Sequence, residues 1–144
     1  MRLLLVALLL SAVNAFAQDS CNLTVRNGSG SSVGRIESDG TIRNDSGSSN
    51  GKFDHGTVRN GSGSSIGQVE MDGTVRNGSG SSVARIDSDG TLRNGSGSSE
   101  GRIDADGTIR NGSGSSVGKF EGYQPACRQV AMAYLHFFNP LHHQ

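Results

Sequence analysis

Acidic turns of the form Asp-x-Asp-Gly are the segments of this chain that most resemble a site with chemistry. The stretches DSDG at 87–90 and DADG at 104–107 resemble the start of a calcium-binding loop. A complete EF-hand loop needs a bidentate glutamate at its twelfth position, and that position counted from Asp87 is Ser98. These segments therefore predict turns between strands rather than a calcium site.

Glycine- and serine-rich segments recur along the chain and raise the question of phosphate binding. Each copy reads Asn-Gly-Ser-Gly-Ser-Ser or a close variant. A phosphate-binding P-loop needs a lysine followed by serine or threonine at the start of a helix, and no lysine stands at that place here. We interpret these segments as flexible connectors.

The four histidines are His55, His136, His142 and His143, and their spacing does not define a ligand set. His142 and His143 would bind a metal weakly at most, and the last residues of a chain are usually frayed. We therefore predict no catalytic residue, no cofactor-binding residue, no metal ligand and no cofactor. We also expect that the protein is not an enzyme.

A phrase of about seventeen residues is repeated along most of the chain, and this repeat must position any functional side chain. An Arg-Asn dipeptide marks each copy, at spacings of 17, 16, 17, 17 and 17 residues. The dipeptides begin at Arg26, Arg43, Arg59, Arg76, Arg93 and Arg110. A period of this length indicates structural units that bury a shared core against their neighbours.

Two columns of mostly β-branched or aromatic residues follow the same period and predict short β-hairpins. In the first complete unit, a three-residue loop at Ser38–Gly40 places Ile36 opposite Ile42. The predicted core pairs are Ile36 with Ile42, Phe53 with Val58, Val69 with Val75, Ile86 with Leu92, and Ile103 with Ile109. Val25 and Phe120 remain as half-units at the two ends, and their meeting would close a ring.

The single spacing of 16 residues tests this register. The loop there lacks one residue, so that a two-residue turn, His55-Gly56, pairs Asp54 with Thr57. Phe53 still faces Val58, whereas a deletion within a strand would have turned Val58 toward solvent. The deletion therefore changes the type of turn and keeps the core pair.

The same register puts charged side chains on the outer face of each hairpin. Arg35 lies opposite Arg43, with Glu37 diagonal to them. We interpret this group as a solvated charge ladder. If it recurs around a ring, it would form a polar recognition rim.

Two architectures would bury the apolar columns, because one hairpin alone is only marginally stable in water. The hairpins close around a central axis, or each repeat forms one coil of a β-solenoid with a ladder of asparagines. The phrase DGTVRNGSGSSIG and its copies resemble the five-fold β-flower family of short exported bacterial repeat proteins. The resemblance covers residues 24–120 and implies hairpin petals around an axis, with no assigned activity. We therefore predict an all-β ring of hairpin repeats of 16–17 residues, with the β-solenoid as the alternative.

The segment after Gly122 has a different composition and predicts a short C-terminal helix. Pro125 suits its first turn, and Asn139-Pro140 should end it. One helical stripe holds Ala126, Val130, Ala133, Tyr134 and Phe137. We expect this helix to cover the open end of the β-array. The alternatives are an apolar anchor for a partner or a membrane surface, and an extended strand.

The N-terminal residues predict a signal peptide that is cleaved after Ala17. An apolar run at Leu3–Leu10 precedes an Ala-x-Ala site at 15–17, and the run is too short to span a membrane. The predicted organisation is a signal peptide at 1–17, a β-repeat domain at 18–122 and a C-terminal helix and tail at 123–144. Export permits a disulfide between Cys21 and Cys127, which bracket the repeats; the alternative is two free or partner-linked thiols.

The charge balance argues against some partners. The chain has 13 basic and 13 acidic residues, which is not the basic composition of a nucleic-acid-binding protein. We expect a non-enzymatic exported repeat protein, with a structural or interaction role in the periplasm, at the cell surface or outside the cell. The alternative is a glycan- or polymer-binding module that uses repeated polar surfaces. A protein or glycan partner would bind these surfaces or the C-terminal apolar helix, and we expect no transmembrane span.

Overall fold

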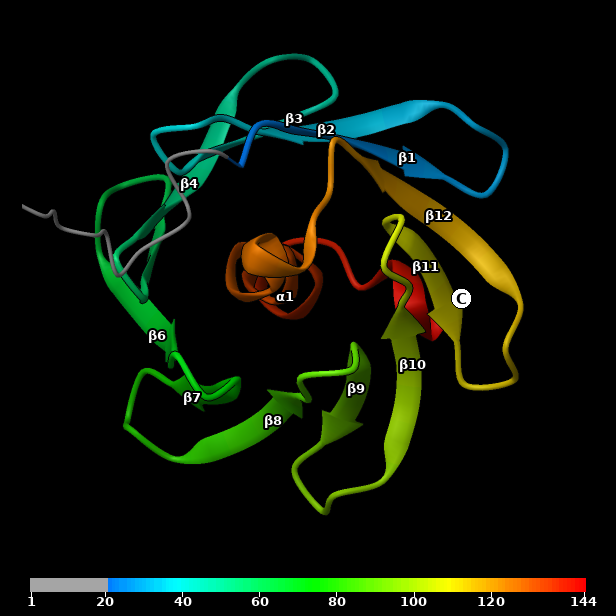
Figure 1. The fold of residues 1–144 in the computed structure, drawn as a ribbon. Helices are drawn as coiled ribbons and strands as arrows, with labels where there is room; N and C mark the ends of the chain where they lie inside the picture. Colours follow the sequence, from blue (N-terminus) through cyan, green and yellow to red (C-terminus); the bar gives the residue numbers. More distant parts are fainter. Residues whose placement is uncertain (1–20) are drawn as a thin grey trace, which may run out of the picture.

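The computed structural model of the chain describes residues 21–144, and the signal peptide predicted for residues 1–17 lies outside them. Within the described part, twelve antiparallel strands form one closed ring around a helix (Figure 1). The strands are β1 (Leu23–Asn27), β2 (Ser32–Ile36), β3 (Thr41–Asn44), β4 (Ser49–Asp54), β5 (Thr57–Asn60), β6 (Ser65–Val69), β7 (Thr74–Asn77), β8 (Ser82–Ile86), β9 (Thr91–Asn94), β10 (Ser99–Ile103), β11 (Thr108–Asn111) and β12 (Ser116–Glu121).

Each strand pairs with its neighbours in the sequence, and the last strand pairs with the first. Of the twelve strand pairs, five are hairpins with turns of two or three residues, and β12 with β1 makes a sixth pair of the same kind, in which Phe120 lies opposite Val25. The two half-units therefore close the ring. The other six pairs are joined by the longer glycine- and serine-rich loops. The β-solenoid alternative is wrong, because successive strands of this chain pair antiparallel to one another and the ends meet.

The five apolar pairs named from the sequence lie opposite each other in the hairpins. In the first hairpin the Glu37 N–H donates to the Thr41 carbonyl at 2.8 Å, and Gly40 has a φ of 92°. In the shortened repeat, His55 and Gly56 have φ values of 50° and 96°, which suits a two-residue turn with both central residues left-handed. The short loop therefore keeps the register, as the spacing predicts.

The glycine- and serine-rich segments are hydrogen-bonded turns rather than flexible connectors. In one of them, Asn77 Oδ1 accepts hydrogen bonds from the Ser79 N–H at 3.0 Å and from the Ser81 N–H at 3.1 Å. Arg76 Nη1 donates to the Gly80 carbonyl at 3.1 Å and closes the loop from the other side. All six loops repeat this pattern. The Arg-Asn dipeptide therefore shapes each outer loop.

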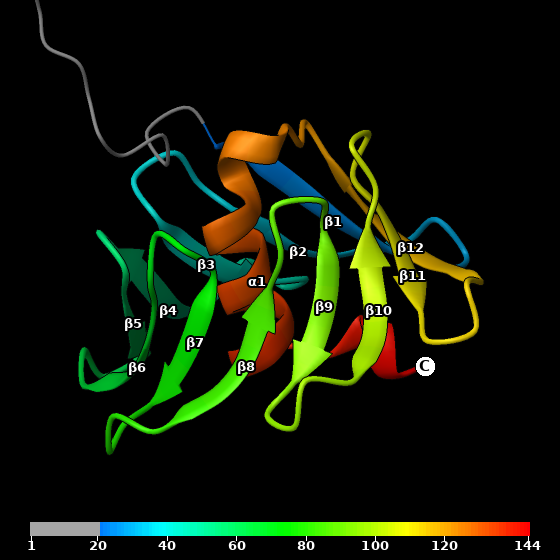
Figure 2. The same cartoon turned by 60° about the horizontal axis from the view of Figure 1, so that its bottom comes forward.

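The C-terminal segment lies inside the ring. It comprises the 3-10 turn η2 (Pro125–Cys127), the helix α1 (Arg128–Phe137) and the 3-10 turn η3 (Leu141–His143). Figures 1 and 2 show α1 running through the middle of the ring, so the prediction that it covers an open end is wrong. All residues from Val130 to Leu135 are buried, and this apolar surface is therefore not available to a partner or a membrane.

A column of small residues on the inner face makes room for this helix. The column consists of Gly34, Gly51, Gly67, Ala84, Gly101 and Gly118, all of them buried. A Cβ atom at Gly34 would lie 2.6 Å from Tyr134 Oη, and one at Gly67 would lie 2.5 Å from Phe137 Cζ. Larger residues in this column would exclude the C-terminal segment from the ring.

A disulfide joins Cys21 and Cys127, and both half-cystines are buried. It ties the chain just before β1 to η2 at the start of the inner segment. A bond of this kind fits a protein outside the reducing cytoplasm. Among residues 21–144, no helix combines the length and the apolar character that crossing a membrane requires.

Candidate functional site

The outer face of the ring carries a cross-strand pair of long polar side chains on six of its twelve strand pairs, namely the five short-turn hairpins and the β12–β1 pair. The pairs are Arg35 with Arg43, Lys52 with Arg59, Gln68 with Arg76, Arg85 with Arg93, Arg102 with Arg110, and Lys119 with Arg26. One carboxylate accompanies each pair: Glu37, Asp54, Glu70, Asp87, Asp104 and Glu121. We call these eighteen residues the outer belt. The charge ladder of the first hairpin therefore recurs around the ring.

One arginine of each pair is fixed by two contacts. In the fourth hairpin, Arg93 Nε lies 2.7 Å from Asp87 Oδ2, and Arg93 Nη1 donates to the Gly97 carbonyl at 3.0 Å. Its equivalents at the other five positions have the same two kinds of partner. Such exposed ion pairs add little stability on their own, but they hold the guanidinium groups in a regular array.

The other member of each pair reaches further into solvent. The side chains of Arg35, Arg85 and Arg102 are 54%, 53% and 53% exposed. Counted together, the belt holds eleven cationic and six acidic side chains, an excess of five positive charges on a chain whose total is balanced. Within residues 21–144, the belt therefore holds all of the lysines and arginines except Arg128.

Much of the compensating negative charge lies on the tips of the short turns. The residues concerned are Asp39, Asp72, Asp89 and Asp106. Each accepts a hydrogen bond from the backbone N–H of the threonine two residues later, and this bond lowers the pKa of each carboxyl below its ordinary value of 3.8. The excess of positive charge in the belt and these four carboxylates thus lie on different parts of the ring.

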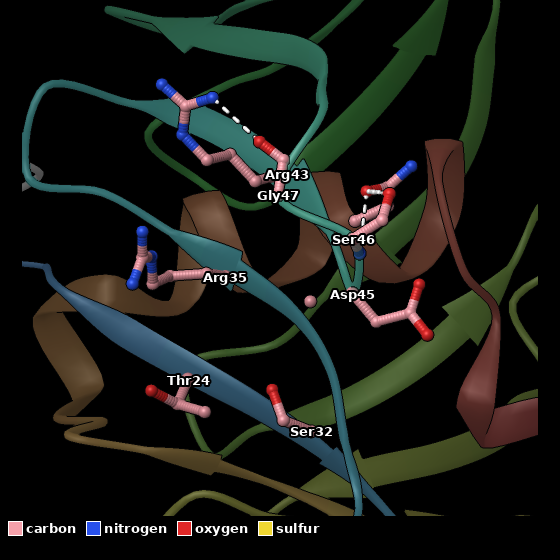
Figure 3. Close-up of a pocket in the computed structure, with 9 residues that line it drawn as sticks. Thr24, Ser32, Arg35, Arg43, Asp45, Ser46 and Gly47 are labelled. Carbon is pink, nitrogen blue, oxygen red and sulfur yellow. Dashed lines mark hydrogen bonds between the residues drawn. The ribbon is translucent and has the colours of Figure 1, made fainter.

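A cavity of about 260 Å³ opens in the belt beside β1, β2 and β3 (Figure 3). Arg35 and Arg43 extend to the same side from neighbouring strands, and Thr24 and Ser32 contribute hydroxyl groups. Asp45 also lines the cavity, at a loop position where the other five copies carry glycine. Such a polar lining suits a hydrated, charged ligand rather than an apolar one.

A second polar group lies at the rim formed by the outer loops. Here Glu100 Oε1 lies 3.4 Å from His142 Nε2 and 3.3 Å from His143 Nε2. These three ligand atoms all lie within 4.8 Å of one another, which is a spacing that could hold a metal ion. Glu100 comes from β10 and the histidines come from η3, so the fold joins residues 42 positions apart.

The spacing of the histidines did not predict this group. The end of the chain was expected to be frayed, whereas Leu141 and His142 are each only 2% exposed and Asn111 Nδ2 donates to the Gln144 carbonyl at 3.1 Å. A signal was present in the repeat itself. The column that contains Glu100 otherwise holds Val33, Asn50, Ile66, Val83 and Val117. Glu100 is therefore the acidic exception in a mostly apolar column.

His142, the buried histidine of this group, has few polar partners. Burial, and then the neighbouring His143, lowers the pKa of His142 below its ordinary value of 6.5, and Glu100 opposes that shift. Its Nδ1 atom is buried and has no hydrogen-bond partner among the described residues. The contact at Nε2 is thus the polar contact that orients this ring.

A family model described as 5-fold beta-flower protein matches residues 22–138. No curated protein and no solved structure matches the chain. The match runs from just before β1 to just after α1, and so includes the inner helix. The description names a fold and no activity, and its count of five equals the number of hairpins that turns of two or three residues connect here, to which β12 and β1 add an equivalent pair.

Proposed function

The chain belongs to the 5-fold β-flower protein family, and we propose that it is an exported, non-enzymatic protein that binds acidic polymers, such as anionic glycans, through the outer belt. The observation that carries this proposal is the recurrence of a cross-strand cationic pair on five of the six strand pairs that carry the belt, with Gln68 and Arg76 on the remaining one. A polymer with regularly spaced anionic groups is the kind of ligand that such a repeated surface matches.

Repetition supports a polymer over a small ligand. A single exposed arginine pair binds an anion weakly, because water screens the charges. Several equivalent pairs on one rigid ring would act together on one polymer, and each further contact would be made at high effective concentration. Arginine also suits carboxylate, sulfate and phosphate groups, because its planar guanidinium can donate two parallel hydrogen bonds.

Two further features support export and a non-enzymatic role. The disulfide between Cys21 and Cys127 fits an oxidising compartment, and the predicted signal peptide would direct the chain there. The groups of the belt are equivalent from petal to petal, whereas an active site needs one distinct arrangement of nucleophile, base and stabilising groups.

The test compares binding to an acidic polysaccharide, heparin, with binding to neutral dextran. We expect salt-sensitive binding to heparin and none to dextran. The triple variant R35Q/R85Q/R102Q removes the three belt arginines whose side chains are most exposed. Its affinity for heparin should be at least roughly tenfold lower than that of the wild type. Its stability should change little, since these ion pairs are exposed.

A matched control separates a local effect from net charge. The triple variant S38D/S88D/A105D lowers the net charge by the same three units, but at exposed turn positions that each follow a belt carboxylate, and it leaves every belt arginine in place. It should retain most of the heparin binding. Equal loss in both variants would show that only net charge matters, and equal binding of the wild type to dextran would overturn the proposal.

A further inference from the structure

We propose that Glu100, His142 and His143 form a binding site for a zinc ion at the loop rim of the ring. This site is separate from the outer belt and does not depend on the function proposed for it. Its ligand atoms are Glu100 Oε1, His142 Nε2 and His143 Nε2, which all lie within 4.8 Å of one another.

The distances between these atoms suit a tetrahedral ion. Zinc binds histidine nitrogen and carboxylate oxygen at about 2.0–2.2 Å, so two ligands of a tetrahedral site lie roughly 3.3–3.6 Å apart. Glu100 Oε1 lies 3.3 Å from His143 Nε2 and 3.4 Å from His142 Nε2. The two imidazole nitrogens lie within 4.8 Å of each other, so small side-chain rotations would bring all three ligand atoms around one ion.

The chemical type of the three ligand atoms favours zinc over calcium and magnesium. Two imidazole nitrogens and one carboxylate oxygen are a borderline set that zinc prefers, whereas calcium and magnesium prefer oxygen ligands alone. The His143 side chain is 54% exposed, while Glu100 is 24% and His142 is 2% exposed. Water can therefore reach the group from the side of His143 and supply the fourth ligand.

The fold holds the three residues in place before any ion binds. Glu100 lies on a strand of the closed ring, and η3 packs beneath β10, β11 and β12. Close packing fixes the backbone of η3, since a Cβ atom at Gly101 would lie 3.1 Å from His142 Cβ. A site built on such a support loses little conformational entropy when the ion binds.

The same residues are poorly explained as ordinary packing. The column of Glu100 is otherwise apolar apart from Asn50, and a charged residue appears in it only where two histidines lie against it. His142 is 2% exposed, and its polar contact among the described residues is a long approach of Nε2 to Glu100 Oε1, which offsets little of the cost of burying a polar ring. A zinc ion bound at Nε2 would supply a strong interaction where the ring now has one long contact of 3.4 Å.

Zinc would fasten the C-terminal segment to the ring. The ion would join β10 to η3, and η3 follows the helix that fills the interior. Binding to the folded chain alone raises the stability of the fold in proportion to the logarithm of the zinc concentration. The melting temperature is therefore a readout of the site that needs no knowledge of any other ligand.

The experiment measures zinc binding and melting temperature on the untagged chain with its disulfide formed. We expect one zinc ion per chain by calorimetry and equilibrium dialysis, and a rise of several degrees in melting temperature that EDTA reverses. The variants E100Q and H143Q each remove one ligand at a partly exposed position, and each should weaken zinc binding at least about tenfold. Zinc should not raise the melting temperature of either variant.

The control variant is H55Q, which removes an exposed histidine from a short turn far from this rim. It should bind zinc as the wild type does. Metal-free melting curves of E100Q and H143Q check that both variants remain folded. No saturable zinc binding by the wild type, or unchanged binding by E100Q and H143Q, would overturn the proposal.

Discussion

In each outer loop, one asparagine side chain accepts hydrogen bonds from backbone N–H groups that have no backbone acceptor within the tight turn. Asn77 Oδ1 accepts from the Ser79 N–H, the Ser79 hydroxyl at 2.8 Å and the Ser81 N–H. Such bonds from a side chain to the following backbone are typical of asparagine in turns. The same loop fixes Arg76 through the Gly80 carbonyl, so that residue-level bonding also sets the direction of the belt arginines.

At the residue scale we predict that Asn77→Ala lowers the free energy of unfolding by about 1–2 kcal/mol, because three donors lose their acceptor in a partly solvated loop. Chemical denaturation would measure this change. The control is Asn77→Asp, which keeps an oxygen acceptor at the same place and should lose less. An alanine variant as stable as the wild type would show that water replaces these bonds without loss.

At the scale of elements, the inner face of the ring and the C-terminal segment have complementary shapes. Successive glycines of the small column lie against different side chains of that segment: Tyr134 at Gly34, Phe138 at Gly51, Phe137 at Gly67, His142 at Gly101 and Leu141 at Gly118. The strands of the ring have a repeated sequence, whereas the C-terminal segment that fills the ring does not. Each glycine therefore has its own neighbour, and its replacement has its own effect.

The element-scale prediction is that Gly67→Ala lowers the free energy of unfolding by about 1–3 kcal/mol. The new Cβ would lie 2.5 Å from Phe137 Cζ and 2.5 Å from the Arg76 carbonyl oxygen, so both the helix and the neighbouring strand would have to move. Denaturation with urea would measure the change, and the intensity of near-ultraviolet circular dichroism would report the displaced aromatic ring.

The matched control is Gly61→Ala in the adjacent loop. A Cβ there would lie 3.5 Å from the Asn50 carbonyl oxygen and 3.6 Å from the Ser49 carbonyl oxygen, both ordinary contacts, and Gly61 is not among the left-handed glycines. This variant should be as stable as the wild type or slightly more stable, because alanine restricts the unfolded chain. Equal losses at both positions would contradict the role given to the small column.

The hairpins could be predicted from the sequence alone, whereas the position of the helix could not. The hairpins were predictable because their signals are local: turn residues, alternation and the compensating deletion at His55-Gly56 each lie within a few residues. The position of α1 was not, since it depends on the width of a ring whose closure joins β1 to β12. The column of small residues is consistent with a filled interior, but it does not indicate that the C-terminal segment fills it.

The rim group was hidden for the same reason. Glu100 and His142 meet only because α1 passes through the ring and returns η3 to the underside of β10. No local pattern relates a strand residue to a histidine 42 positions later. The outer belt, by contrast, follows from the hairpin register, since Arg35 opposite Arg43 on one hairpin implies the same on its copies.

At the scale of the whole molecule, closure is the demanding step. Pairing β1 with β12 brings together segments at opposite ends of the array, and the loop entropy of that contact must be offset before the ring encloses its helix. The disulfide spans 106 residues and joins the start of the ring to the start of the inner segment. It therefore restricts the unfolded chain in the direction that favours closure.

We predict that the double variant C21A/C127A is less stable than the wild type by about 2–5 kcal/mol, because a bridge across so long a loop removes much of the entropy of the unfolded chain. Guanidinium denaturation of the oxidised protein, the reduced protein and the variant would measure this. Reduction should reproduce the effect of the substitutions, apart from the small loss of packing at two buried positions. If all three samples unfold at the same guanidinium concentration, closure is held by the β1–β12 pair and the enclosed helix alone, and the bridge has no part in it.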